Sequence, residues 1–286
     1  MLTIGLAVVA ILAGIVGAPA AHAEEPAGSV KAAGTLNYVA IGSSYAAGPD
    51  MSVVKKSCLR SSDNYPHRVA EARKMHLIDV TCTGATTANV VSRPQSRWTN
   101  EVQIAAVGPD TDLVTITVGG NDLEYLGRLT AMSCQTVTLR TRNTPAFRAC
   151  RTGAAIPDEP SKSAYTSVEQ NLVRIVLDAR VRAPRAQIVL VDYPPALPPS
   201  MRPCAQLPLT GEQMAVTKRI FDGLAAATAG AARTTGAKLV QASKAGAAHS
   251  VCSAQPWLSG FTPPWPYHPT ELGKRAVADL VLSAIR

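Results

Sequence analysis

The sequence lacks several patterns that mark common classes of protein. None of its six cysteines stands in a Cys-x-x-Cys pair, so the sequence gives no support to a zinc site or to thioredoxin-like redox chemistry. Its basic residues are scattered, and no run is longer than two residues, as in Lys55-Lys56. The net charge of +8 therefore indicates a mildly basic surface rather than a nucleic-acid-binding patch. We expect no metal, no cofactor and no nucleic-acid partner.

After its first 23 residues, the sequence also lacks any apolar run long enough to span a bilayer. Those first residues are apolar and end in Ala21-His22-Ala23, which is typical of a secretory signal cleaved after Ala23. No Lys or Arg precedes the run, and an uncleaved membrane anchor is the competing interpretation. We expect a signal peptide at 1–23, a flexible mature N-terminus at 24–34 and one folded domain at 35–286. The protein would be secreted, either extracellular or associated with the cell envelope.

The cysteine count agrees with export. All six cysteines lie in the mature part of the chain, and an even number in an oxidising compartment indicates three disulfides. The sequence alone leaves the pairing open, because six cysteines can be connected in many ways. We favour the sequential pairing, which joins Cys58 to Cys82, Cys134 to Cys150 and Cys204 to Cys252.

Short apolar runs alternate with helical patterns along the mature chain. The runs are mostly β-branched or leucine-rich and are flanked by turn-forming residues, which suits strands covered on both faces of a parallel sheet. They lie at 36–41, 77–81, 112–118, 187–192 and 238–241. Capping residues and apolar side chains at helical spacing predict helices at 62–74, 163–182, 210–235 and 270–285. The alternation predicts a single α/β domain with three layers around a parallel sheet.

Two segments fit this alternation poorly. Residues 125–160 are polar and hold two cysteines, and we interpret them as a disulfide-pinned excursion after the third strand. Residues 194–208 form a proline-rich loop after the fourth strand. Ligands of open α/β sheets bind just outside the carboxyl ends of the strands, so we expect both segments to shape a site.

Four sequence blocks lie at predicted strand or helix boundaries, and each contains a reactive or polarising group. They are GSSYAAG at 42–48, CTGAT at 82–86, GGND at 119–122 and WPYHP at 265–269. Each block alone is compatible with an ordinary turn or with a structural histidine. Together they supply what acyl transfer needs: a nucleophilic hydroxyl, a histidine base, and backbone or amide donors for a negative oxygen.

In these blocks the sequence resembles the SGNH/GDSL hydrolase superfamily, and more narrowly its secreted bacterial lipase and esterase branch. The resemblance covers about residues 36–285. It implies that Ser44 is the nucleophile, that His268 is the general base, and that no metal is needed. It also implies an oxyanion hole built from the Ser44 N–H, the Gly84 N–H and the side-chain amide of Asn121. The implied fold is a flavodoxin-like α/β/α sandwich with five strands in the order 2-1-3-4-5, and the sequential disulfide scheme also resembles that branch.

The chain departs from the family pattern at two positions. Ser43 stands where the Gly-Asp-Ser block has an aspartate, and Trp265 stands where the catalytic aspartate precedes the histidine by three residues. A histidine that acts as a base needs a hydrogen-bond acceptor for the proton on its other ring nitrogen, Nδ1. That hydrogen bond fixes the tautomer and the orientation of the ring. We expect the backbone carbonyl of Trp265 to accept from Nδ1 of His268, which makes a Ser–His dyad.

The resulting prediction is a secreted carboxylic ester hydrolase, an esterase or lipase that acts on an ester or lipid substrate. One alternative is a glycan or polysaccharide O-deacetylase that uses the same residues and stacks sugars on exposed aromatics such as Trp257, Trp265 and Tyr267. Another is a catalytically silent surface-binding protein on the same scaffold, favoured only by the missing aspartate. The basic charge would also suit a lipid or cell-envelope surface, and we expect a monomer.

Overall fold

The computed structural model describes residues 34–49, 58–140, 150 and 155–285. The predicted signal peptide, and the predicted mature N-terminus apart from Gly34, lie outside the described residues. Gly34–Arg286 is one compact unit. Within the described ranges, no helix combines the length and the apolar composition that a bilayer span requires.

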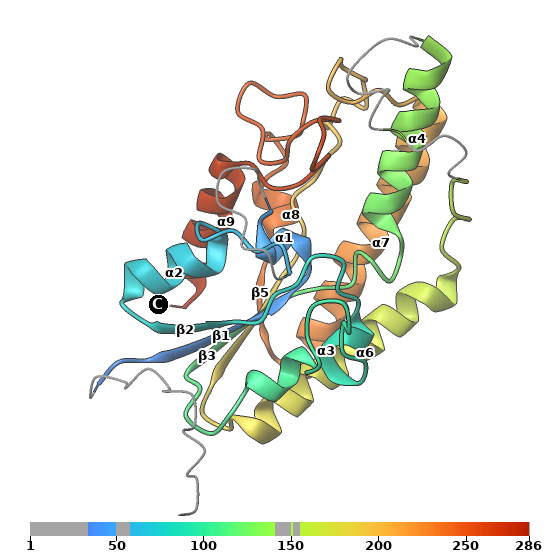
Figure 1. Ribbon diagram of the computed structural model, residues 1–286. Helices are drawn as coiled ribbons and strands as arrows, with labels where there is room; N and C mark the ends of the chain where they lie inside the picture. The colour runs from blue at the N-terminus through green and yellow to red at the C-terminus, as the bar shows by residue number, and fades with distance from the viewer. Residues whose placement is uncertain (1–33, 50–57, 141–149, 151–154, 286) are drawn as a thin grey trace, which may run out of the picture. The chain divides into compact units, whose positions relative to one another are not determined.

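Five parallel strands form the central sheet in the order β2-β1-β3-β4-β5, as predicted (Figure 1). They are β1 (Asn37–Gly42), β2 (His76–Asp79), β3 (Leu113–Thr117), β4 (Gln187–Val191) and β5 (Lys238–Val240). Each strand coincides closely with one of the apolar runs. Parallel strands have both faces covered by crossover helices, which is why they read as continuous apolar segments.

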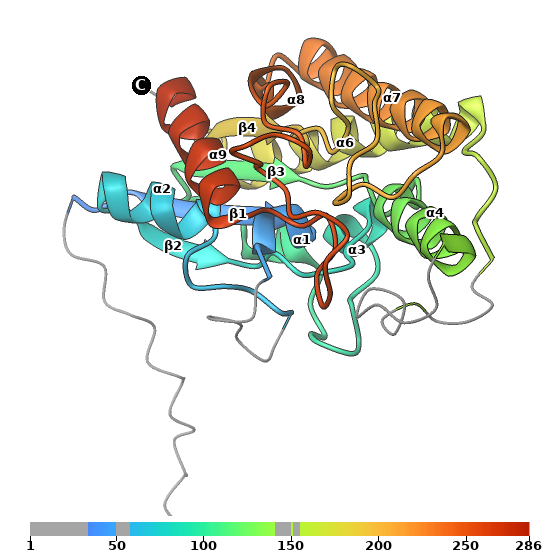
Figure 2. The ribbon, with the colours of Figure 1, turned by 90° about the horizontal axis from the view of Figure 1, so that it is seen from above.

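Successive side chains of a strand enter different cores. Val39 and Ile41 of β1 pack into one hydrophobic cluster, while Tyr38 and Ala40 pack into a second cluster on the opposite face. The first face is covered by α3 (Thr87–Val91), α6 (Lys162–Arg182) and α7 (Gly211–Thr235). The second face is covered by α2 (Tyr65–Arg73) and α9 (Glu271–Ala284), which lie side by side (Figure 2). The three-layer α/β/α architecture is therefore confirmed.

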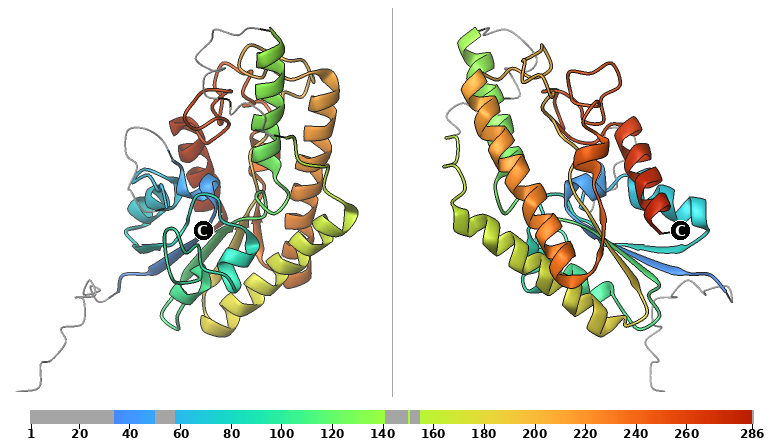
Figure 3. Two further views of the ribbon diagram at one scale, coloured as in Figure 1. Left: turned by 45° about the vertical axis from the view of Figure 1, so that its right-hand side comes forward. Right: turned by 180° about the vertical axis from the view of Figure 1, so that it is seen from behind.

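One long helix is absent from the sequence-based expectations. Residues 125–140, expected to be irregular, form a long helix, α4 (Tyr125–Arg140), which lies beside α7 in several views (Figures 1 and 3). Tyr125, Leu129 and Met132 are buried at helical spacing, but the polar residues between them hid the pattern. The Thr136 hydroxyl donates to Gln213 Oε1 of α7 at 2.9 Å. The excursion thus begins with a helix that extends the layer containing α7.

The three disulfides connect in the predicted sequential order. They join Cys58 to Cys82, Cys134 to Cys150 and Cys204 to Cys252. The first of them fastens the segment that follows β2, and the second fastens α4, so the predicted pinning of the polar excursion is confirmed. All three bridges therefore hold segments that follow the carboxyl ends of strands.

Candidate active site

The first sequence block forms the end of β1 and the short helix α1 (Ser44–Ala47). A Cβ atom on Gly42 would lie 2.6 Å from the carbonyl oxygen of Thr117, so only glycine fits at this close approach of two strands. The side chain of Gln103 accepts from the Gly42 N–H at 2.8 Å and donates to the Gly42 carbonyl at 3.1 Å. The turn that follows, with Ser44 at the first position of α1, is therefore rigidly held.

Ser44 is almost closed off from solvent. Its exposed fraction is 4%, and it lines a small cavity together with residues of the Gly-Gly-Asn-Asp block. The other residues around this cavity are Ser43, Tyr45, Gly120, Asn121, Tyr125, Leu126 and Tyr193. The structure thus brings the first and third sequence blocks together around one hydroxyl group.

The histidine block approaches the same region from the C-terminal part of the chain (Figure 1). The hydroxyl of Tyr45 donates to the backbone carbonyl of Tyr267 at 2.9 Å, and the rings of Tyr45 and His268 have centroids 6.1 Å apart. A residue next to Ser44 therefore fastens the loop that carries His268. His268 is buried, and its Nε2 atom has no hydrogen-bond partner within the part of the chain that the structure describes.

The other ring nitrogen of His268 is held by a backbone carbonyl, as expected, but chiefly by that of the next residue. Nδ1 lies 3.0 Å from the carbonyl oxygen of Pro266, whereas the Trp265 carbonyl accepts from the Ser259 hydroxyl at 2.9 Å. A weaker backbone hydrogen bond to the Trp265 carbonyl also favours the protonated ring, after that to Pro266. The shift by one residue has a local cause, because Tyr267 adopts φ +61° and so turns the Pro266 carbonyl back toward the ring.

The expected oxyanion donors come from three loops. The Asn121 side-chain amide donates one hydrogen to the carbonyl of Ala85 at 2.8 Å, which leaves its second hydrogen available. Gly84 lies in an exposed turn with φ +82°, a conformation that favours glycine. Among the described residues, the N–H groups of Ser44 and Gly84 have no acceptor.

Asp122, the last residue of the Gly-Gly-Asn-Asp block, holds the start of α3. Its carboxylate accepts from the Thr87 N–H at 3.0 Å and from the Thr87 hydroxyl at 2.5 Å, at the start of α3. Burial raises the pKa of Asp122, and these hydrogen bonds oppose the rise. Asp122 therefore fixes the loop of Asn121 against α3 rather than contacting Ser44 or His268.

Burial makes the His268 ring neutral over a wide range of pH. Desolvation lowers the pKa of His268 from 6.5 to about 4, and the carbonyls of Pro266 and Trp265 oppose that effect. A neutral imidazole is the form that can accept a proton. Within the described ranges, no group of three or more His, Cys, Asp or Glu side chains is placed to hold a metal ion.

The pH dependence of activity follows from that pKa. A base with a lowered pKa stays neutral as the pH falls, so activity should be lost as the pH passes through about 4, not through the ordinary histidine value of about 6.5. The measurement is kcat/KM on a soluble ester across the acidic range, with far-ultraviolet circular dichroism at each pH as the control for folding. An acidic midpoint at the ordinary histidine value, with the fold intact, would contradict the expectation.

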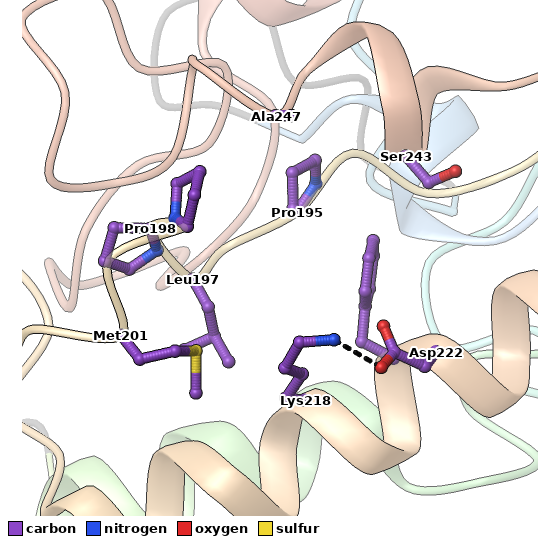
Figure 4. Close-up of a pocket in the computed structure, with 10 residues that line it drawn as sticks. Pro195, Leu197, Pro198, Met201, Lys218, Asp222, Ser243 and Ala247 are labelled. Atoms are coloured by element: carbon purple, nitrogen blue, oxygen red, sulfur yellow. Dashed lines mark hydrogen bonds and ion pairs between the residues drawn. The ribbon is translucent and has the colours of Figure 1, made fainter.

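A second, larger cavity opens where the proline-rich loop after β4 faces α7 (Figure 4). Its volume is about 150 Å³. The lining is mainly apolar, with an ion pair at one side between Lys218 and Asp222 at 2.5 Å. The lining residues are Pro195, Leu197, Pro198, Pro199, Met201, Lys218, Phe221, Asp222, Ser243 and Ala247. The ring of Phe221 lies 6.0 Å from that of Tyr125, which lines the cavity at Ser44.

The aromatics expected to be available for stacking on sugars are mostly buried. Trp257 is 7% exposed and Tyr267 is fully buried, while Trp265 is partly buried with its ring nearly perpendicular to that of His268. Trp257 instead stacks on His249, with ring centroids 4.8 Å apart. The expectation of an exposed aromatic platform is therefore wrong for Trp257 and Tyr267, because the loop before α9 folds them inward.

Several residues that organise the site carry no motif of their own. Tyr45 holds the histidine loop, Gln103 clamps Gly42, and the hydroxyl of Tyr193 lies 3.2 Å from both Ser43 Oγ and the Gly120 nitrogen. Tyr193 directly follows a predicted strand, but nothing in the sequence indicated its partners. Tertiary contacts alone reveal these three roles.

Comparison with known proteins agrees with this geometry. Residues 40–276 match the GDSL-like lipase/acylhydrolase family. The chain is 34% identical over 271 residues to Lipase 2 of Streptomyces coelicolor, with 91% of this chain and 89% of that protein covered. The structure of an extracellular lipase from Streptomyces rimosus superimposes with a TM-score of 0.66 at 27% identity, over 87% of this chain and 100% of the other.

A phospholipase A1 from Streptomyces albidoflavus shares the fold, with a TM-score of 0.68 at 22% identity, over 87% of this chain and 99% of the other. The family match spans most of the described domain and includes all four sequence blocks. The five-stranded parallel sheet in the order 2-1-3-4-5 is in keeping with the fold of these similar structures. The chain belongs to the GDSL-like lipase/acylhydrolase family of ester hydrolases.

Proposed function

We propose that the protein is a secreted esterase or lipase in which Ser44 and His268 act as a catalytic dyad. The observation that carries this proposal is the pairing of a buried serine turn with a buried histidine whose Nδ1 is held and whose Nε2 has no partner among the described residues. Nε2 is then free to accept the proton of the Ser44 hydroxyl as Oγ attacks the ester carbonyl. Three disulfides and the extracellular lipase among the similar structures support export.

The reaction proceeds in two acyl-transfer steps. Ser44 Oγ forms a bond to the acyl carbon, and the carbonyl oxygen becomes negative in the tetrahedral intermediate. The imidazolium of His268 then gives its proton to the departing alkoxide, which leaves an acyl-enzyme. In the second step, water attacks the acyl carbon, His268 takes the water proton, and that proton returns to Ser44 Oγ as the carboxylic acid leaves.

The negative oxygen of the intermediate would be received by preorganised donors. The N–H groups of Ser44 and Gly84 and the second hydrogen of the Asn121 amide have no other acceptor among the described residues. Fixed dipoles stabilise developing charge without having to reorient, and in many enzymes this stabilisation contributes more to catalysis than any other effect. The Pro266 carbonyl takes over the orienting role of the missing carboxylate, but as a neutral group it stabilises the imidazolium less.

We also propose that the cavity between the proline-rich loop and α7 receives the acyl chain of the substrate. Its lining is mainly apolar, and Phe221 of this cavity packs against Tyr125, which lines the cavity at Ser44. Apolar side chains stabilise a bound methylene chain by removing it from water, at roughly 0.8 kcal/mol per buried CH₂. A substrate with a longer acyl chain should therefore be preferred over an acetyl ester.

Filling this cavity should change the chain-length preference. The variant Met201→Trp is expected to lower kcat/KM for p-nitrophenyl octanoate by about tenfold, since a few buried methylenes lose their site, while the rate on p-nitrophenyl acetate stays near that of the parent protein. The matched control is Val181→Trp, which places the same ring on an 80% exposed position of α6. Equal losses on both esters, or no preference for octanoate in the parent protein, would argue against an acyl site here.

A further inference from the structure

A single hydroxyl group contacts both the nucleophile turn and the Asn121 loop. Tyr193 follows β4 and is buried, and its hydroxyl oxygen accepts from the Gly120 N–H at 3.2 Å. The same hydroxyl lies 3.2 Å from Ser43 Oγ. Because the oxygen accepts from Gly120, its own hydrogen is available for donation to Ser43. Ser43 precedes Ser44, and Gly120 precedes Asn121. The Tyr193 hydroxyl therefore forms a bridge between the residues that precede two members of the proposed oxyanion hole.

The ring that carries this hydroxyl has little freedom to move. It packs against the ring of Tyr45 with centroids 4.6 Å apart. A Cβ atom on Gly120 would lie 3.1 Å from the Tyr193 ring, so the glycine allows the loop to approach this closely. Burial raises the pKa of Tyr193 to about 12, although its hydrogen bonds with Ser43 and Gly120 lower it, so the phenol keeps its hydrogen at neutral pH.

We propose that Tyr193 is a positioning residue, whose hydroxyl sets the distance between the Ser44 turn and the Asn121 amide. The inference rests on the proposed function, since it assigns a purpose to the bridge only if those groups hold an oxyanion. It also gives the serine at position 43 a role, because this small hydroxyl leaves room for the phenol where the family pattern has a carboxylate. Tyr193 follows β4, and none of the four sequence blocks lies at the end of that strand.

The test is the variant Tyr193→Phe, which keeps the ring and removes only the bridge. We expect kcat on p-nitrophenyl butyrate to fall about tenfold, less than the loss caused by deleting an oxyanion donor, because the donors remain but lose their alignment. KM should change little, since donors to the oxyanion act mainly in the transition state. Ser43→Ala removes only the contact between the Tyr193 hydroxyl and Ser43, while the Gly120 N–H still donates to Tyr193. Because one neutral hydrogen bond is lost, kcat should fall by about twofold.

Tyr38→Phe is the matched control. Tyr38 is a fully buried tyrosine on β1, and its hydroxyl lies 2.7 Å from the Thr115 hydroxyl on the face of the sheet that α2 and α9 cover. Its loss should lower the melting temperature about as much as Tyr193→Phe does but leave kcat unchanged. Parental kcat in Tyr193→Phe, or the same loss of kcat in both tyrosine variants, would overturn the inference.

Two further comparisons keep the test decisive. If Tyr193→Phe does not fold, the Ser43→Ala variant decides: a lower kcat at constant KM supports the bridge, and parental kcat overturns it. If Ser44→Ala retains activity, the proposed dyad itself fails. If Ser44→Ala is inactive while Tyr193→Phe is fully active, the dyad stands and only the role of Tyr193 is refuted.

Discussion

Replacing Ser44 with alanine is expected to remove ester hydrolysis, with a fall in kcat of at least about 10⁴-fold on p-nitrophenyl butyrate. The hydroxyl is the proposed attacking group, and the adjacent serine is not placed to take over its role. Ser43 lies beside it, but its Oγ faces the Tyr193 hydroxyl at 3.2 Å. The measurement is the steady-state rate of purified protein, with the melting temperature as the check that the variant is folded.

The adjacent serine supplies the control for this experiment. Ser43→Ala removes a hydroxyl of the same size, one residue away and also buried, and should lower kcat only about twofold. A fluorophosphonate probe, which bonds covalently to an activated serine, should label the parent protein and Ser43→Ala but not Ser44→Ala. Hydrolysis or labelling that survives in Ser44→Ala would refute the assignment of the nucleophile. Absence of labelling in the folded parent protein would favour a catalytically silent binding protein.

The second large effect is expected at His268. His268→Gln should lower kcat by at least about 10³-fold, because a neutral amide cannot accept the Ser44 proton at Nε2. The substitution keeps a polar side chain of similar length, which limits damage to the buried site. The loss of the base should also remove the acidic limb of the pH profile, since the group that titrates there is gone.

Trp265→Phe is the companion variant for that prediction. The orienting acceptors are backbone carbonyls of Pro266 and Trp265, and a backbone carbonyl is retained when a side chain is exchanged. Phenylalanine also preserves an aromatic ring beside that of His268. A much smaller loss than in His268→Gln is therefore expected. Equal losses in the two variants would mean that the Trp265 side chain, rather than the carbonyls, holds the histidine.

The strands of the sheet were predictable because their signals are local and strong. A parallel strand buried on both faces must be apolar along its whole length, so β1, β3 and β4 were visible as runs. The helix α4 was not visible, because its buried face mixes the apolar residues Leu129 and Met132 with the polar residues Arg128 and Ser133. A search for apolar periodicity does not recognise polar residues as buried.

The sequence predicted which residues form the candidate site, but not all of the contacts between them. The positions of Ser44 and His268 followed from sequence blocks, and their partners depended on backbone conformation. The acceptor of Nδ1 is chiefly Pro266 because Tyr267 adopts a positive φ, which spacing along the chain does not reveal. The bridge through Tyr193 joins residues 150 positions apart, so no local pattern could indicate it.

By itself, the sequence determined the apolar runs that form the strands and the four blocks on which family membership rests, because these are local patterns. The residues alone left the disulfide pairing open, and the strand order came from the resemblance to the family. The tertiary structure decided which carbonyl holds His268, which hydroxyl ties Ser43 to Gly120, and that Trp257 and Tyr267 are buried. These features depend on contacts between segments that meet only when the sheet has formed. The amino-acid sequence determines which chemical groups are present, and tertiary packing determines the distances between them.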